Sequence, residues 1–327
     1  MITAINITNT KMDMDRFHDR DTLKHFYGNH GIDGVELMLC GNRNISEKIT
    51  CSDVIGIHLS FFPSWMDFWT GNREALNKEY GEEKIWKEYY GGCEQADFLR
   101  KWEEELEIAH QLNVKYVVFH VSECTLEECV TYRFRYTDEQ VCLAAAEIIN
   151  HLLKGKSYQF YFLAENLWWS GLTLTNPEVT QNFLDRIHYD RKGIMLDTGH
   201  LIHTNNDIAT QEEAVQYIHS VLKKNGELCK YIKGIHLNQS LSGKYVKEII
   251  AHPPQLATNY KDRLMQIYPH IFKIDYHKPF TADGVTNLIQ QISPRFLTFE
   301  LITNNNQEHE DALKQQLNAL NRNGGLK

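Results

Sequence analysis

Eight short apolar runs, rich in β-branched and aromatic residues, recur along the 327-residue chain and constrain its fold more than any other feature. They are Thr3–Thr8, Gly34–Leu39, Val54–Ser60, Tyr116–Ser122, Gln159–Asn166, Gly193–His200, Ile232–Asn238 and Phe296–Leu301. Between them lie stretches with helical periodicity, such as residues 96–112, 138–153, 177–187 and 210–224. Nearly continuous apolar strands that alternate with helices are typical of parallel sheets. Eight such units predict a closed (β/α)8 TIM barrel, with a doubly wound sheet as the alternative.

The composition indicates one folded domain that spans residues 1–327. Hydrophobic residues make up 42% of the chain and charged residues 24%, values typical of soluble globular proteins. No apolar run reaches the roughly 18 to 20 residues of a membrane span, and the N-terminus does not resemble a secretory signal. The seven cysteines include no C-x-x-C pair, and we interpret the closest two, Cys124 and Cys129, as packing residues. We therefore expect a cytoplasmic protein with reduced thiols.

Six consecutive predicted strands carry a histidine or an acidic residue near their carboxyl ends. These residues are His58, His120, Glu165, Asp197 together with His200, His236, and Glu300. The carboxyl ends of barrel strands meet at one face, where buried charges need compensation. A single such histidine is usually a satisfied core residue. Six consecutive positions favour divalent cations, which bind imidazole and carboxylate groups. Coupled titrating groups without a metal are the alternative.

A further pair of candidate ligands, Asp275 and His277, lies two positions apart in "FKIDYHKPF". On an extended segment, residues i and i+2 point the same way. We therefore expect both side chains to reach one ion.

Two segments are longer than a plain barrel requires, and both follow a predicted strand directly. They run from Phe61 to Gln95 and from Gln239 to Phe272. We expect both on the C-terminal face of the barrel, as lids or substrate walls. In the first, Gly91 and Gly92 form a candidate hinge. Its first aromatic residues could line a substrate site or simply pack over the barrel: Phe61, Phe62, Trp65, Phe68 and Trp69.

The chain contains the motifs "LAEN", "LDTGH", "IHLNQS", "IDYH" and "TFEL", in that order. With them it resembles the xylose isomerase-like barrel superfamily, and in particular its endonuclease IV branch (AP endonuclease family 2), over essentially its whole length. Endonuclease IV enzymes hold three zinc ions with nine ligands. The resemblance places these at His58, His120, Glu165, Asp197, His200, His236, Asp275, His277 and Glu300. The sugar isomerases and epimerases of the superfamily use one ion, and the corresponding set is Glu165, Asp197, His236 and Glu300.

The chain also departs from both branches. The segment between His236 and Asp275 is much longer than in endonuclease IV and begins "QSLSGK", where that family continues Asp-Ser-Lys. The aromatic segment after His58 differs as well, and the Arg-containing loop of the epimerases is not found. The net charge of −9 disfavours non-specific binding to nucleic acid, although a local basic groove stays open. These departures disfavour DNA as the substrate and indicate a separate branch.

The charge of the nine-ligand set predicts the chemistry. Its four carboxylates bring four negative charges and three divalent ions bring six positive ones. About two positive charges remain for a hydroxide and an anionic substrate. We expect a multi-metal hydrolase of a small phosphoester or sugar-phosphate-like molecule, with two or three zinc ions, or else manganese or iron. Glu165 would bridge two ions, and Glu300 would bridge or act as a base.

Other functions fit parts of the pattern. The main alternative is a metal-dependent sugar isomerase or epimerase, in which Glu165 and Glu300 move a proton on and off carbon. A non-catalytic metal or sugar binder and an oxidative iron enzyme are further alternatives. Lys244 and Arg43 are candidate phosphate contacts, although solvated loop charges are the simpler interpretation.

Overall fold

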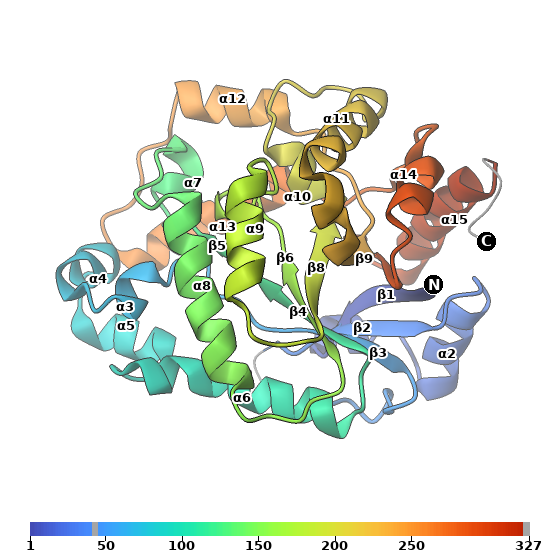
Figure 1. Cartoon of the computed structure of the whole chain (residues 1–327), viewed down its shortest axis with the longest axis horizontal. Coiled ribbons are helices and arrows are strands. Elements are labelled where there is room, and N and C mark those ends of the chain that lie inside the picture. The colour runs from blue at the N-terminus through green and yellow to red at the C-terminus, as the bar shows by residue number, and fades with distance from the viewer. Residues whose placement is uncertain (41–44, 323–327) are drawn as a thin grey trace.

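Eight parallel strands form a closed barrel at the centre of the molecule (Figure 1). The computed structural model describes residues 1–40 and 45–322. The barrel strands are β1 (Ile2–Thr8), β2 (Gly34–Met38), β3 (Val54–His58), β4 (Tyr116–His120), β6 (Tyr161–Glu165), β8 (Lys192–Asp197), β9 (Ile232–His236) and β10 (Phe296–Phe299). Strand β1 pairs with both β2 and β10, and this pairing closes the barrel. The predicted TIM barrel is therefore confirmed, and the doubly wound alternative is wrong.

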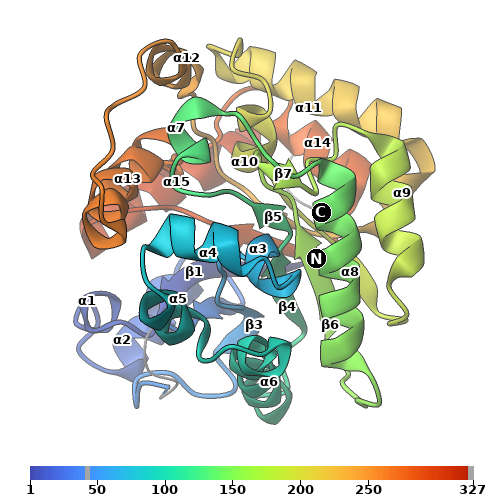
Figure 2. The same cartoon turned by 90° about the vertical axis from the view of Figure 1, so that its left-hand side faces the viewer.

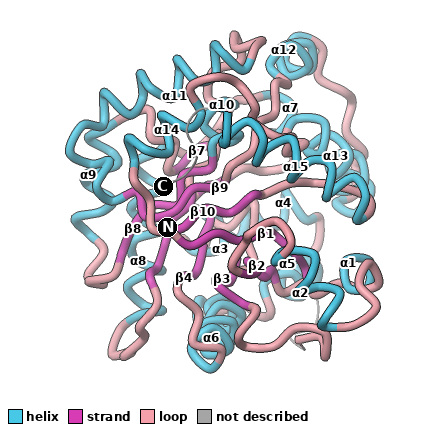
Figure 3. Tube along the Cα trace, turned by 90° about the vertical axis from the view of Figure 1, so that its right-hand side faces the viewer, coloured by secondary structure: helices cyan, strands magenta, loops and turns pink. Residues whose placement is uncertain are grey.

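Helices surround the strands, as the cyan coils around the magenta strands in Figure 3 show. The predicted helices form as α6 (Gln95–Gln111), α8 (Asp138–Leu153), α9 (Pro177–Arg186) and α11 (Gln211–Asn225). Thr137 and Thr210 cap α8 and α11 by accepting a backbone N–H in the first turn, and Pro177 opens α9. Other elements are α1 (Lys11–Met14), α2 (Arg20–Gly28), α7 (Glu128–Thr131), η1 (Gly226–Tyr231), α14 (Val285–Ile292), α15 (Asn306–Arg322) and the small sheet β5 (Ser122–Glu123) with β7 (Ser170–Gly171).

Inside the barrel, an apolar layer lies below a polar layer. The apolar layer consists of Tyr116, Val118, Leu163, Met195 and Phe296, all buried. Alternate residues of a strand face the same side, so Glu165 faces inward two positions after Leu163. Asp197 follows Met195 in the same way. The sheet thus brings a ring of polar side chains to the carboxyl ends of the strands.

The space that Gly56 leaves on β3 is filled by the ring of Tyr116 on β4. A Cβ atom at position 56 would lie 2.3 Å from Tyr116 Cζ. The ring has little freedom to move, because its hydroxyl donates a hydrogen bond to Glu36 at 2.7 Å. The two residues are therefore matched in size across neighbouring strands.

Two insertions follow β3 and β9 and pack against each other (Figure 2). The first forms α3 (Met66–Trp69), α4 (Arg73–Tyr80) and α5 (Glu83–Tyr90), and the second forms α12 (Gly243–Ala251) and α13 (Tyr260–Ile274). The rings of Tyr80 and Tyr260 lie 4.4 Å apart, and Arg263 pairs with Glu79 at 3.6 Å. The two segments expected as long loops are therefore largely helical.

Most aromatic residues at the start of the first insertion are packing residues. Phe62, Trp65, Phe68 and Trp69 are buried. Glu123 of β5 accepts the backbone N–H groups of Trp65 at 2.6 Å and Met66 at 3.0 Å, and so holds the start of α3. Phe61 differs, because it is 43% exposed. Gly91 ends α5 with φ 83°, and the hinge expected at Gly91 and Gly92 stays a prediction.

The cysteines are reduced, as the sequence predicts. All seven cysteines are free thiols. Cys124 and Cys129 are buried in a second apolar cluster with their sulfur atoms 3.4 Å apart, as expected of packing residues. Among residues 1–40 and 45–322, no helix is both long and apolar enough to cross a membrane.

We predict that Gly56→Ala lowers the free energy of unfolding by about 1–3 kcal/mol, the usual cost of overpacking a filled core. Urea unfolding followed by circular dichroism measures the change. Gly28→Ala is the matched control, because no atom outside the neighbouring backbone of its own helix lies within 4 Å of its Cβ position. Equal stability of the two variants would mean that Tyr116 has room to move.

Candidate metal centre

The structure brings eight of the nine predicted ligands into three linked groups, and the ninth, Asp275, contacts His200 and His277 of the third group. The first group is His58, His120 and Glu165; the middle group is Glu165, Asp197, His236 and Glu300; the third group is Asp197, His200 and His277. Within each group the potential ligand atoms lie within 4.8 Å of one another. Glu165 belongs to the first two groups and Asp197 to the last two. The groups therefore form one continuous row.

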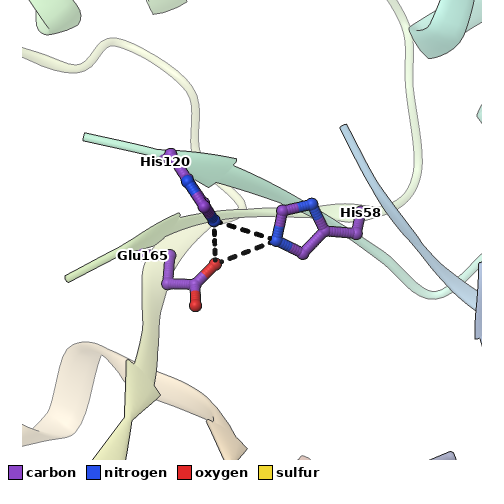
Figure 4. Close-up of side chains that lie close together, drawn as sticks. All are labelled: His58, His120 and Glu165. Carbon is purple, nitrogen blue, oxygen red and sulfur yellow. Dashed lines mark hydrogen bonds and ion pairs between the residues drawn. The ribbon is translucent and has the colours of Figure 1, made fainter. Parts of the chain in front are cut away.

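The first group is a compact triangle at the ends of β3, β4 and β6 (Figure 4). Glu165 Oε2 lies 3.1 Å from His58 Nε2 and 3.2 Å from His120 Nε2, and the two nitrogens are 3.1 Å apart. His58 Nδ1 donates to the Leu59 carbonyl at 2.9 Å, so Nε2 carries the lone pair of the neutral ring. Ligand atoms about 2.0–2.1 Å from a tetrahedral zinc ion lie about 3.3 Å apart, close to the sides of this triangle.

The middle group is arranged around His236, at the end of β9. Its Nδ1 atom lies 3.0 Å from Glu165 Oε1 and 3.1 Å from Glu300 Oε2. Asp197 Oδ2 lies 3.9 Å from the same nitrogen. On the other edge of the ring, Nε2 lies 3.0 Å from the carboxylate of Glu36. The Nδ1 atom of His236 thus faces three carboxylates, those of Glu165, Glu300 and Asp197.

The third group begins where β8 ends. Asp197 caps the short helix α10 (Thr198–His203) by accepting the His200 N–H at 2.6 Å. Because this helix starts directly after Asp197, the strand is shorter than the predicted run Gly193–His200. His200 Nδ1 donates to the Asn166 carbonyl at 2.9 Å, and Nε2 faces Asp275 Oδ2 at 3.2 Å.

Asp275 and His277 meet as predicted, but not on an extended segment. Helix α13 continues to Ile274, Asp275 is its C-cap, and His277 has a left-handed φ of 41°. The backbone N–H of His277 donates to Ser240 Oγ at 3.0 Å, which holds this turn. His277 Nε2 lies 2.8 Å from Asp275 Oδ2. The expected backbone conformation is therefore wrong, because a helix end and a turn bring the two side chains together.

Two further buried residues belong to the site and were not predicted. Glu36 lies in the middle of β2 and is 2% exposed. His203 ends α10, with Nε2 3.3 Å from Asp275 Oδ1. The spacing of His200 and His203 was a usable signal, because residues three positions apart share a helix face. For Glu36, the signal was a carboxylate inside an otherwise apolar strand.

Of the two candidate phosphate contacts, Lys244 has the exposure expected of a solvated charge. Lys244 is exposed on α12, and Arg43 lies outside the described residues. In the described part of the chain, no Lys or Arg forms an ion pair with a carboxylate of the three groups or with Asp275. Histidines are therefore the charge partners of these carboxylates.

Burial and mutual contact shift the pKa values of the cluster. Burial raises the pKa of Glu165, but neighbouring imidazolium charges, that of His236 foremost, hold it well below its usual range. Burial lowers the pKa of His236, yet nearby carboxylates, Glu300 first, raise it well above normal. Carboxylates likewise raise the pKa of His277 to about 9, against its burial, and burial raises that of Asp197 to about 7. Cations that bind here must displace protons from the histidines.

The donor set fits divalent cations. Two buried atoms, His277 Nδ1 and Glu300 Oε2, form no hydrogen bond of regular geometry, although Glu300 Oε2 lies 3.1 Å from His236 Nδ1. Imidazole nitrogens and carboxylate oxygens are ligands of zinc, manganese and iron. Cations in these groups would give the two atoms a partner and offset the buried negative charge.

Comparison with known proteins agrees with the barrel and the predicted resemblance. A family model described as xylose isomerase-like TIM barrel matches residues 92–282, more than half of the chain. The chain belongs to this family. No curated protein matches the chain.

Solved structures resemble the chain along nearly its whole length. The crystal structure of AsfvAP:AG is 12% identical, with a TM-score of 0.51 and coverage of 98% of this chain and 98% of that chain. The structure of the IOLI protein with a binding zinc atom is 11% identical, with a TM-score of 0.51 and coverage of 98% and 96%. The probable 3-DHS dehydratase AsbF from Bacillus anthracis is 12% identical, with a TM-score of 0.51 and coverage of 97% and 98%. At these identities the likeness shows the fold alone.

We predict that Glu165→Gln leaves the protein folded but removes at least one bound ion per chain and abolishes activity. The amide keeps the shape of the side chain but lacks the negative charge that two cations would share. Elemental analysis of purified protein measures the ions, and circular dichroism checks the fold. Glu123→Gln makes the same change at a buried carboxylate outside the three groups. Full ion content in Glu165→Gln would remove Glu165 from the centre.

Proposed function

We propose that the chain is a divalent-metal-dependent hydrolase of a small phosphoester or sugar-phosphate-like substrate. The position of Glu165 carries this proposal. Its Oε2 atom faces His58 and His120, and its Oε1 atom lies 3.0 Å from His236 Nδ1 and 3.4 Å from His200 Nδ1. A carboxylate with both oxygens engaged suits a bridge between two cations. It is poorly placed to take a proton from a substrate carbon at the same time.

The charge of the site supports an anionic substrate. Glu36 adds one negative charge to those of Glu165, Asp197, Asp275 and Glu300, so the total is five. Three divalent cations would leave the site one positive charge in excess, whereas two would leave it one negative charge in excess. A phosphate ester is therefore attracted by a three-ion site without any nearby Lys or Arg.

Glu300 is the residue best placed to act on a substrate. Its side chain is 13% exposed, whereas those of Glu165 and Asp197 are fully buried. Burial raises the pKa of Glu300, but the charge of His236 and other histidines holds it well below normal, so the carboxylate is ionised and suits binding a cation or orienting a water molecule more than accepting a proton. When bound, the cations would activate water and stabilise the charge on the phosphate.

The surroundings of the site favour a small molecule over DNA. The chain carries a net charge of −9, which opposes non-specific binding to a duplex. Phe61, the exposed aromatic residue beside the first group, stacks on His120 with ring centroids 4.4 Å apart. Its free face offers an apolar wall on one side of the site.

A sugar isomerase or epimerase is the second candidate, and the middle group supports it. Glu165, Asp197, His236 and Glu300 lie together and match the one-ion set of those enzymes. In this function Glu165 and Glu300 would transfer the proton. The first and third groups, however, would then have no task.

We predict two or three divalent ions per chain in protein purified with its metal. The linked arrangement of the three groups is the reason. Elemental analysis gives the number directly. One ion per chain, insensitive to Asp275→Ala, would favour the isomerase.

Activity assays separate the two candidates. We expect metal-replete protein to hydrolyse small phosphoesters, and Asp275→Ala to lower that rate by about 100-fold, the upper end of the range for disturbing the surroundings of a metal. The assay compares small phosphoesters, an abasic-site duplex and a set of ketoses. Interconversion of ketoses alone, intact in Asp275→Ala, would overturn the hydrolase.

A further inference from the structure

We propose that Glu36 is a positioning residue, which holds His236 in the tautomer and orientation that bind a cation in the middle group. The inference rests on the proposed function only in that an ion occupies this group. Both candidate functions share that requirement, because both use Glu165, Asp197, His236 and Glu300.

The two edges of the His236 ring have different partners. Both oxygens of Glu36 lie 3.0 Å from Nε2, while Nδ1 faces Glu165 and Glu300 at 3.0 and 3.1 Å. A neutral imidazole has one N–H and one lone pair. Without an ion, carboxylates face both nitrogens and the ring carries both protons. A carboxylate can only accept, so when a cation displaces the Nδ1 proton, Glu36 keeps the other proton on Nε2 and the Nδ1 lone pair faces the other ligands.

Glu36 is itself held from two other strands. The Tyr116 hydroxyl from β4 donates to its Oε2 atom at 2.7 Å, and Thr298 Oγ1 from β10 donates to the same atom at 2.9 Å. All these groups are buried inside the barrel. The orientation of His236 on β9 is therefore determined by buried residues of three other strands, β2, β4 and β10.

Nothing in the barrel fold requires a carboxylate at this position. Among the described Lys, Arg and His side chains, His236 is the one that forms an ion pair with Glu36. Buried ion pairs can often be replaced by apolar side chains without loss of stability. A role toward His236 accounts for the charge, because residues that bind the outer nitrogen of a metal-ligating histidine fix its tautomer and raise its basicity.

The variant Glu36→Gln tests this role at nearly constant volume. The two hydroxyls still have an oxygen to donate to, so the amide nitrogen is directed toward His236 Nε2. An N–H donor there stabilises the opposite tautomer, with the proton on Nδ1 and no lone pair toward the middle group.

We expect Glu36→Gln to raise the Kd of one Zn²⁺ ion per chain about 10- to 100-fold, the range for residues that orient metal ligands. Competition with a chromophoric chelator measures the Kd. The visible spectrum of the Co²⁺-loaded protein should also change, because its ligand field reports on the histidine. The control Glu123→Gln changes a buried carboxylate that contacts Trp65 and Met66, and should leave both readouts as in the wild type.

The outcomes are distinguishable. If the wild-type protein binds no Zn²⁺, the proposed function is overturned; if it binds Zn²⁺ and Glu36→Gln matches it in Kd and spectrum, only the role of Glu36 is overturned. If Glu36→Gln does not fold, Tyr116→Phe replaces it, since it removes one hydrogen bond to Glu36 and keeps the ring. A smaller rise in Kd would then support the role, and an unchanged Kd would overturn it.

Discussion

The architecture of the site depends on one buried carboxylate. Glu165 lies fully inside the barrel, with histidines from three strands and one helix around its two oxygens. Removing a carboxylate from water costs several kcal/mol unless other charges compensate. The described Lys and Arg side chains supply none of that compensation, so protonated histidines or bound cations must. Asp197 is also buried and needs the same compensation of its charge. Because Glu165 and Asp197 each belong to two groups, the three groups form one row and not separate clusters.

The histidines are oriented mainly from outside the groups. His58 donates to a carbonyl of its own chain segment, His200 to the carbonyl of Asn166, and His236 is held by Glu36. For His58 and His236 this contact engages the nitrogen that faces away from the three groups, whereas Nδ1 of His200 also lies 3.4 Å from Glu165 Oε1. The side chains are thus arranged before any ion binds, and the folding of the rigid barrel supplies the free energy that holds them in place. His203 plays a comparable part toward Asp275, because it contacts the oxygen that His200 and His277 leave free.

Sequence patterns were sufficient for the fold and for most of the site. All eight apolar runs became barrel strands, because their composition and spacing leave few other arrangements. Most of the predicted ligands come together because the carboxyl ends of parallel strands share one face, whereas Asp275 and His277 come from the turn after α13. Their role as metal ligands stays a prediction. Local backbone geometry was harder to predict from the sequence. Asp197 caps a helix where a strand was expected, and α13 ends in a turn at Asp275 where an extended segment was expected. Glu36 was missed because its importance depends on Tyr116 and Thr298, which are distant in sequence and adjacent only across the closed barrel.

Closure of the barrel by β1 and β10 has a consequence for the order of events in the cell. Strand β10 precedes Glu300 directly and is the last strand to leave the ribosome. His58 and Glu300 are 242 positions apart, which corresponds to about 10 to 50 s of translation at ordinary elongation rates. During that time the acidic interior lacks both its last wall and one of its four carboxylate ligands. Metal loading of a centre built from these residues would therefore follow synthesis of the chain up to Glu300, and a chain terminated before that residue would have no complete middle group to fill.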